Sequence, residues 1–215
     1  MSKKTSVDMT EGSIVRLLLA FAIPIICGVI LQNLYNSFDA IIVGQFVSTE
    51  ALAAVSASAD ISQLIVGFFT GLSTGAGVLF ARYYGAKEYD KLHQAIHTGI
   101  LLAVYIGLIM SIVGVGVTPW LLNLVDCPPD VFADAEAYLR IYLVGVFFTA
   151  IYNVGAGVLR AVGDSKRPLI YLCISSVLNV VLDIFLVTII PLGVVGVAIA
   201  TVVAGMVTFV LLILR

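Results

Sequence analysis

The segment LIYLCISSVLNVVLDIFLVTII, residues 169–190, decides the fold. Its only charged side chain is Asp183, and the rest of the run is almost entirely apolar. A helix needs about 20 such residues to cross the hydrocarbon core of a bilayer. The segment therefore predicts a membrane-spanning helix.

Five further apolar stretches surround this one. The six expected spans lie at 14–47, 51–82, 95–117, 135–159, 169–190 and 194–214. The chain of 215 residues is 61% hydrophobic and 11% charged, with a mean hydropathy of +1.13. Soluble domains carry roughly twice that charged fraction. We expect an all-α membrane protein in which six transmembrane helices form one bundle over 14–215, preceded by an N-terminal segment, 1–13.

The basic side chains fall on one side of the membrane if the six spans alternate in direction. That side holds Lys3, Lys4, Arg16, Arg82, Lys87, Lys91, Arg160, Lys166, Arg167 and Arg215. The opposite side holds Glu50, Asp126, Asp130, Asp134 and Glu136, with Arg140 as the only nearby cation. Positively charged loops stay in the cytoplasm. Both termini, including the 1–13 segment, are therefore expected to be cytoplasmic.

Charge and motifs argue against two classes of function. A net charge of -2 provides no basic surface for nucleic-acid phosphates. The sequence contains no Gly-x-Ser-x-Gly, His-Glu-x-x-His or Gly-x-x-x-x-Gly-Lys motif. His93, His97 and Asp90 share a helical face at metal-compatible spacing, but such an interfacial set is more often simply solvated. We expect no enzyme, no metal site and no nucleic-acid partner.

Asp183 is the polar residue that most needs an explanation. A charged side chain near the bilayer centre costs about 2.5–3.5 kcal/mol on insertion scales. Asn179 lies one turn before Asp183, so the two share a helix face. Such a carboxyl exchanges a proton, holds a cation beside amide oxygens, or forms a static helix–helix hydrogen bond. The pattern favours a functional role over the static bond.

The first span carries a second polar face. Gln32, Tyr35, Asn36 and Asp39 recur at steps of three and four residues. This face is either the wet outer end of the helix or part of a cavity, and its length favours the cavity. Pro24 removes a backbone hydrogen bond and predicts a bend in this helix.

Three other polar residues inside the spans are less informative. Asn153 is equally consistent with helix packing and with a binding site. Thr201 is placed to line the same cavity as Asp183, although threonine often bonds back to its own helix. Asp60 lies among serines near the start of the second span, and a structural role is favoured there.

Together these residues resemble the multidrug and toxin extrusion (MATE) transporters. In the first and second spans the matching residues are Pro24, Gln32, Tyr35-Asn36, Asp39, Gly44, Gly67, Gly71, Gly75, Ala81-Arg82 and Gly85-Ala86. Further along they are the turn from Arg160 to Pro168 (RAVGDSKRP), Asn179, Asp183, Gly193, Gly196, Ala198 and Ala200-Thr201. Asp60 departs from the family pattern, which has a small or apolar residue there.

The resemblance implies an antiporter that exports drugs or other small organic, often cationic, compounds. Export would be driven by H⁺ or Na⁺ with no other cofactor, across the plasma membrane (the inner membrane of a bacterium). The implied ion-coupling residues are Asp39, Asn179, Asp183 and Thr201. The implied substrate cavity contains Gln32, Tyr35, Asn36 and Asn153, and the implied helix bend is at Pro24.

One departure from the family is large. MATE transporters have two such lobes, about twelve helices, and the six spans here match the N-terminal lobe only. Alternating access needs two bodies that move against each other. The expected partner is a second six-helix lobe, either a missing C-terminal half or a second copy. Two alternatives remain: a flippase for lipid-linked sugars, which would favour a more cationic cavity, and a non-transporting scaffold or truncated fragment.

Overall fold

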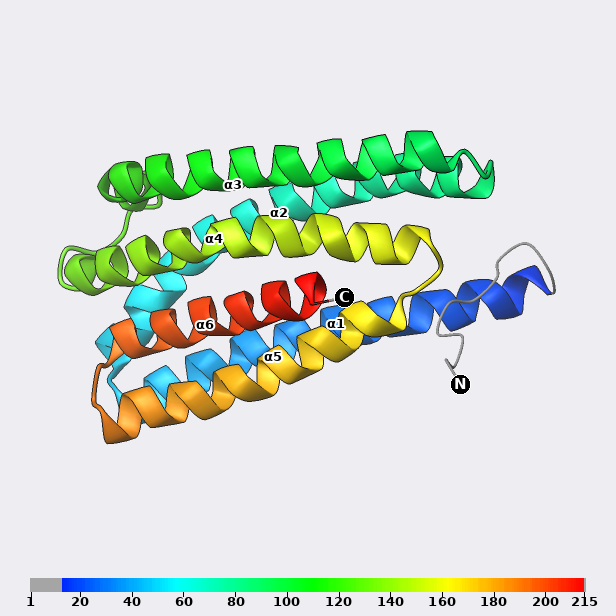
Figure 1. The fold of residues 1–215 in the computed structure, drawn as a ribbon. Helices are drawn as coiled ribbons and strands as arrows, with labels where there is room; N and C mark the ends of the chain where they lie inside the picture. The colour runs from blue at the N-terminus through cyan, green and yellow to red at the C-terminus, as the bar shows by residue number, and fades with distance from the viewer. Residues whose placement is uncertain (1–12, 215) are drawn as a thin grey trace.

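Six long helices make up almost all of the structure, a computed structural model that describes residues 13–214 (Figure 1). They are α1 (Ile14–Phe46), α2 (Thr49–Gly85), α3 (Tyr89–Leu124), α4 (Phe132–Ala161), α5 (Lys166–Ile184) with the π-helical turn η1 (Phe185–Ile189), and α6 (Val194–Ile213). All six are long and apolar enough to cross a membrane. The expected all-α membrane bundle of six helices is confirmed. Residues 1–12 and 215, with Lys3, Lys4 and Arg215, lie outside the described part.

The third helix departs most from its expected bounds of 95–117. It begins at Tyr89 and ends at Leu124. Hydropathy marks only the part of a helix that contacts lipid, whereas polar residues such as Asp90, Lys91 and His93 extend the same helix before it. The backbone hydrogen bonds of the helix are satisfied internally in water as well as in lipid.

The centre of the bundle is α4. It packs against α2, α3 and α6, whereas α1 packs mainly against α5. Figure 1 shows α4 between α3 and α6, with α1 and α5 together at the edge of the bundle. In the most apolar stretch of 18 residues of α4, 50% of the residues are buried inside the structure, compared with 6% in the corresponding stretch of α1. The bundle therefore has a well-packed core around α4 and a more open edge at α1.

Two glycines permit the close approach of helices to α4. A Cβ added to Gly107 on α3 would lie 3.0 Å from the Ala150 Cβ and 3.3 Å from the Phe147 Cα. A Cβ added to Gly157 on α4 would lie 2.7 Å from the Ser73 Oγ and 3.1 Å from its carbonyl oxygen. Association of membrane helices depends on such small residues, because lipid supplies no hydrophobic driving force between helices.

Asp164 organises the turn between α4 and α5. It is 2% exposed, and its carboxylate accepts a hydrogen bond of 3.2 Å from the Arg167 backbone N–H. The Arg167 guanidinium also pairs with the carboxylate at 2.9 Å. The carboxylate thus satisfies one of the free N–H groups in the first turn of α5, and it fixes where α5 starts.

Replacement of Gly157 by alanine tests the contact between α2 and α4. We expect Gly157→Ala to lower the free energy of unfolding by about 1–3 kcal/mol, because overpacking at this site pushes against the Ser73 backbone. Gly116→Ala on α3 is the matched control, since no atom lies within 4 Å of the added Cβ. Thermal unfolding in detergent compares the two variants. Equal stability of both would contradict the packing account.

Candidate functional site

Two carboxyl groups face each other across the contact between α1 and α5. Asp39 on α1 is 6% exposed and Asp183 on α5 is 0% exposed. Their side chains are neighbours across this contact. A carboxylate only accepts hydrogen bonds, so a bond between the two groups requires that one of them carry a proton. The arrangement is therefore suited to hold a proton between two helices.

Most polar atoms at this contact have no other partner. Five buried polar atoms have no hydrogen-bond partner among residues 13–214 when both carboxyl groups are ionised. They are Asp39 Oδ1, both carboxyl oxygens of Asp183 and both amide atoms of Asn179. Asn179 is 0% exposed and lies one turn before Asp183. Buried polar groups without partners cost about 1–3 kcal/mol each. The cluster consequently has unused capacity to bind a proton or a small cation.

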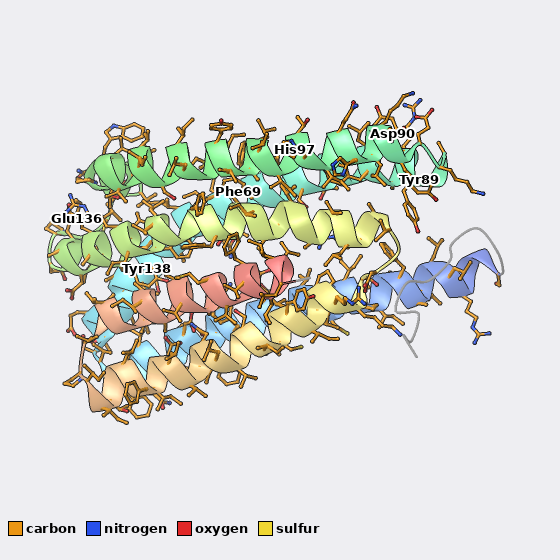
Figure 2. All side chains as sticks on the ribbon, in the orientation of Figure 1. Phe69, Tyr89, Asp90, His97, Glu136 and Tyr138 are labelled. Atoms are coloured by element: carbon orange, nitrogen blue, oxygen red, sulfur yellow. The ribbon has the colours of Figure 1, made fainter. Side chains whose placement is uncertain are left out.

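Tyrosines border the pair on two sides. The Tyr35 side chain on α1 lies beside Thr201 of α6, whose hydroxyl donates to the Val197 carbonyl of its own helix at 3.0 Å. Tyr138 on α4 lies close to both Asp39 and Asp183. Figure 2 shows Tyr138 on the side of α4 toward α6, in agreement with its packing against Val197. Residues from α1, α4, α5 and α6 thus meet at one site.

Sequence reasoning missed the tyrosines of α4. The rings of Tyr138 and Tyr142 stack with their centroids 6.3 Å apart and their planes 14° apart. The only signal in the sequence is their spacing of one helical turn. Aromatic residues at that spacing are common in membrane helices, so this signal does not separate a site from ordinary packing.

Among residues 13–214, no hydrogen bond joins the other predicted cavity residues, Gln32, Asn36 and Asn153, to the carboxyl pair. Asn36 is exposed and Gln32 is half-buried, both on α1. Asn153 donates to the Thr149 carbonyl of its own helix at 2.9 Å. Asn153 therefore takes part in the structure of α4 in this conformation. Pro24 lies inside α1, which runs as a single helix from Ile14 to Phe46.

Two further sequence motifs lie outside the site. Asp60 is exposed on α2 and does not take part in the carboxyl pair. Asp90, His93 and His97 are exposed on the first turns of α3, and Figure 2 labels Asp90 and His97 there. Among residues 13–214, no group of three or more His, Cys, Asp or Glu side chains is arranged to hold a metal ion.

A π-helical turn follows Asp183 directly. Residues Phe185–Ile189 form this turn, and Val187 within it is buried. Such turns widen the helix by one residue and occur often at functional sites. The turn marks the end of α5 that carries the carboxyl group.

Comparison with known proteins places these residues in context. The MatE family model matches residues 24–185, a region that starts at Pro24 and includes both Asp39 and Asp183. The chain belongs to the MatE family. Among its curated relatives is the probable multidrug resistance protein YpnP of Bacillus subtilis (strain 168), which is 28% identical over 94% of this chain and 45% of its own length.

Solved structures of MatE relatives share the fold. A MOP superfamily transporter from Pyrococcus furiosus Vc1 is 28% identical with a TM-score of 0.90, covering 99% of this chain and 47% of that one. A MATE structure in the bent conformation is 29% identical with a TM-score of 0.88, covering 94% of this chain and 45% of that one. The chain therefore spans about half the length of the relatives it matches.

Substitutions of Asp183 test the contact between the two carboxyl groups. Asp183→Asn keeps the shape and provides an N–H donor for Asp39, so we expect a free energy of unfolding close to that of the wild type. Asp183→Leu leaves Asp39 buried without its partner and should lose about 1–3 kcal/mol. Thermal unfolding in detergent measures both variants. A leucine variant as stable as the asparagine variant would contradict the contact.

Proposed function

We propose that this MatE chain acts as one six-helix lobe of a transporter that exports small organic, often cationic, compounds in exchange for H⁺ or Na⁺. The observation that carries the proposal is the buried pair of Asp39 and Asp183 beside the unpartnered Asn179. Intramembrane carboxyl groups that face a protein interior are typical of ion pathways and proton relays.

Coupling follows from the chemistry of the pair. With one proton present, the two carboxyl groups bind each other and hold α1 against α5. Loss of the proton leaves two like charges in a poorly solvated contact, which favours separation of the helices or entry of a cation. Na⁺ takes oxygen ligands, and carboxylate and amide oxygens are both available at the site. Either ion thus changes the α1–α5 contact, which is the step that an antiporter needs.

The charge of the site favours cationic substrates. Deprotonated Asp39 and Asp183 would attract an organic cation, and Tyr35 and Tyr138 add aromatic faces that bind cations. Competition between substrate and coupling ion for the same carboxylates then gives antiport. The Pyrococcus furiosus relative has a binding pocket of reverse polarity that suggests a different function, so pocket charge rather than the fold separates functions among these proteins.

The helix bend at Pro24 belongs to the same proposal. Pro24 has no N–H to donate, so the backbone carbonyl one turn earlier lacks its helical partner and α1 bends there at low cost. A solved MATE relative in the bent conformation is consistent with such a movement. Protonation at the pair would then shift α1 between straight and bent forms.

A second lobe is the proposed partner, because the relatives are about twice as long and alternating access requires two bodies. The open stripe of Gly67, Gly71 and Gly75 on α2 supports this, since no atom lies within 4 Å of a Cβ added at any of the three. Glycines at every fourth position let a second helix approach closely. The second lobe is either a separate half or another copy of this chain. The proposed location is a plasma membrane, and the distribution of basic residues favours an orientation in which both termini of this chain are cytoplasmic.

Transport assays test the function directly. The chain, alone and together with its candidate second lobe, is reconstituted into vesicles and the loss of a cationic dye is followed under a proton or sodium gradient. We expect gradient-driven export only from the two-lobe assembly, and Asp183→Asn should reduce it to the level of empty vesicles. Asp134→Asn, which removes an exposed carboxylate at the start of α4, is the control. Export that keeps its ion dependence in Asp183→Asn would contradict the coupling role.

The glycine stripe gives a separate prediction about assembly. Gly71→Leu places a large side chain on the docking face of α2 and should weaken association with a second lobe. Gly116→Leu on α3 is the matched control, because its glycine is equally open but lies off the stripe. Retention of one tagged copy by another in detergent measures self-association. If the unsubstituted chain retains its copy, equal retention for both variants would remove the stripe from the interface between copies.

A further inference from the structure

Arg160, in the last turn of α4, is placed unusually for a cation near the end of a membrane helix. It is half-buried, and its guanidinium donates a hydrogen bond of 3.3 Å to the Ser73 hydroxyl on α2. Ser73 in turn donates to the Asn153 carbonyl, and a Cβ added to Gly157 would lie 2.7 Å from the Ser73 hydroxyl oxygen. The guanidinium is therefore level with Gly157, about one turn before Arg160, and it points back toward the middle of α4.

Two common roles of a terminal cation do not explain this orientation. Long cationic side chains near the end of a membrane helix usually extend to the polar interface, which is the opposite direction. A cation in the last turn also stabilises the partial negative charge of the final carbonyl groups. The contact with Ser73 instead holds the Arg160 guanidinium before those carbonyl groups. Its charge is therefore directed at the side of the bundle and not at the solvent beyond the helix end.

Among the cations of residues 13–214, Arg160 is distinct because it is half-buried and forms no ion pair with an acid. Arg140 pairs with Glu136 at 2.7 Å, and Arg167 pairs with Asp164 at 2.9 Å. The other cations are exposed, and they are Arg16, Arg82, Lys87, Lys91 and Lys166. A guanidinium has several N–H donors, and the contact with α2 occupies one of them. Arg160 can therefore bind an anionic group without losing its contact with α2.

Arg160 lies on the open side of the contact between α2 and α4. Helix α3 covers the opposite side, where Gly107 meets Ala150 of α4. Helical periodicity places Thr70 and Thr74 of α2 on the same side as Arg160, and both threonines are exposed inside a membrane-spanning helix. Around α2 these threonines are followed by the glycine stripe proposed to face the second lobe. The Arg160 side chain thus opens toward the region that this lobe would cover.

We propose that Arg160 binds a carboxylate of the second lobe across the open side of the α2–α4 contact. The proposal rests on the second lobe of the proposed function, and it specifies the chemistry of one contact between the lobes. Charge complementarity supports an acidic side chain, because a half-buried charge is costly until it is paired. The glycine stripe admits a helix close to α2, which brings the side chains of that helix toward Arg160. Arginine and carboxylate groups then form two parallel hydrogen bonds.

Association assays with charge variants test this pair. The tagged chain is mixed in neutral detergent with a second copy and with the candidate second lobe, and the dissociation constant is measured at low and high salt. Arg160→Gln keeps a donor for Ser73 and removes the charge, so it should weaken association about tenfold or more at low salt and reduce the dependence on salt. Arg160→Lys keeps the charge without the paired donors and should give an intermediate value. Arg140→Gln, which removes a cation at the other end of α4, is the control and should change neither.

Three outcomes would overturn the proposal. If Arg160→Gln associates as the unsubstituted chain does while Gly71→Leu does not, the second lobe stands without this contact. If the unsubstituted chain binds neither partner, the second lobe and the arginine pair fail together.

Modification by phenylglyoxal, a reagent for accessible guanidinium groups, gives the third outcome. Arg160 should react in the chain alone and be protected in the assembly. Protection of the chain alone in phosphatidylglycerol nanodiscs, but not in phosphatidylcholine nanodiscs, would assign Arg160 to a lipid phosphate instead.

Discussion

Two carboxyl groups buried in a membrane domain must be neutralised, and this requirement shapes the α1–α5 side of the bundle. Each ionised carboxyl at such a position costs several kcal/mol unless a proton, a cation or a hydrogen-bond donor compensates it. Here each of the two groups is the main partner of the other. Under the proposed coupling, the contact between α1 and α5 is strong with a proton between Asp39 and Asp183 and weak without one.

The position of the pair within the bundle matters as much as its chemistry. The glycine contacts of α4 fix α2, α3 and α6 around a dense core, as at Gly107 and Gly157. Packing of α1 is confined mainly to α5 and to part of α2. The ionisable contact thus lies where α1 has few other helix contacts, so under the proposed coupling a change in proton occupancy would act on the helix with the least support from its neighbours.

The sequence was sufficient for the fold and for the position of the acids, for clear physical reasons. Lipid imposes apolar runs of a set length, so six spans are readable from composition, and a lone acid in such a run, like Asp183, stands out. The arrangement across helices was less accessible. The amide of Asn153 bonds to its own helix, which depends on a rotamer, and Tyr138 enters the site through the angle at which α4 meets α6.

The unequal lengths of the helices determine how the protein fits its host bilayer. At 1.5 Å per residue, the 37 residues of α2 extend over about 55 Å, whereas the 24 residues from Lys166 to Ile189 extend over about 36 Å, nearer the hydrocarbon thickness. The shorter segment limits the matched thickness, because turns bound it at both ends. A helix longer than the bilayer adapts by changing its tilt, whereas a helix that is too short requires the bilayer to become thinner. Membranes thicker than the Lys166–Ile189 span should therefore strain this protein more than thinner ones do.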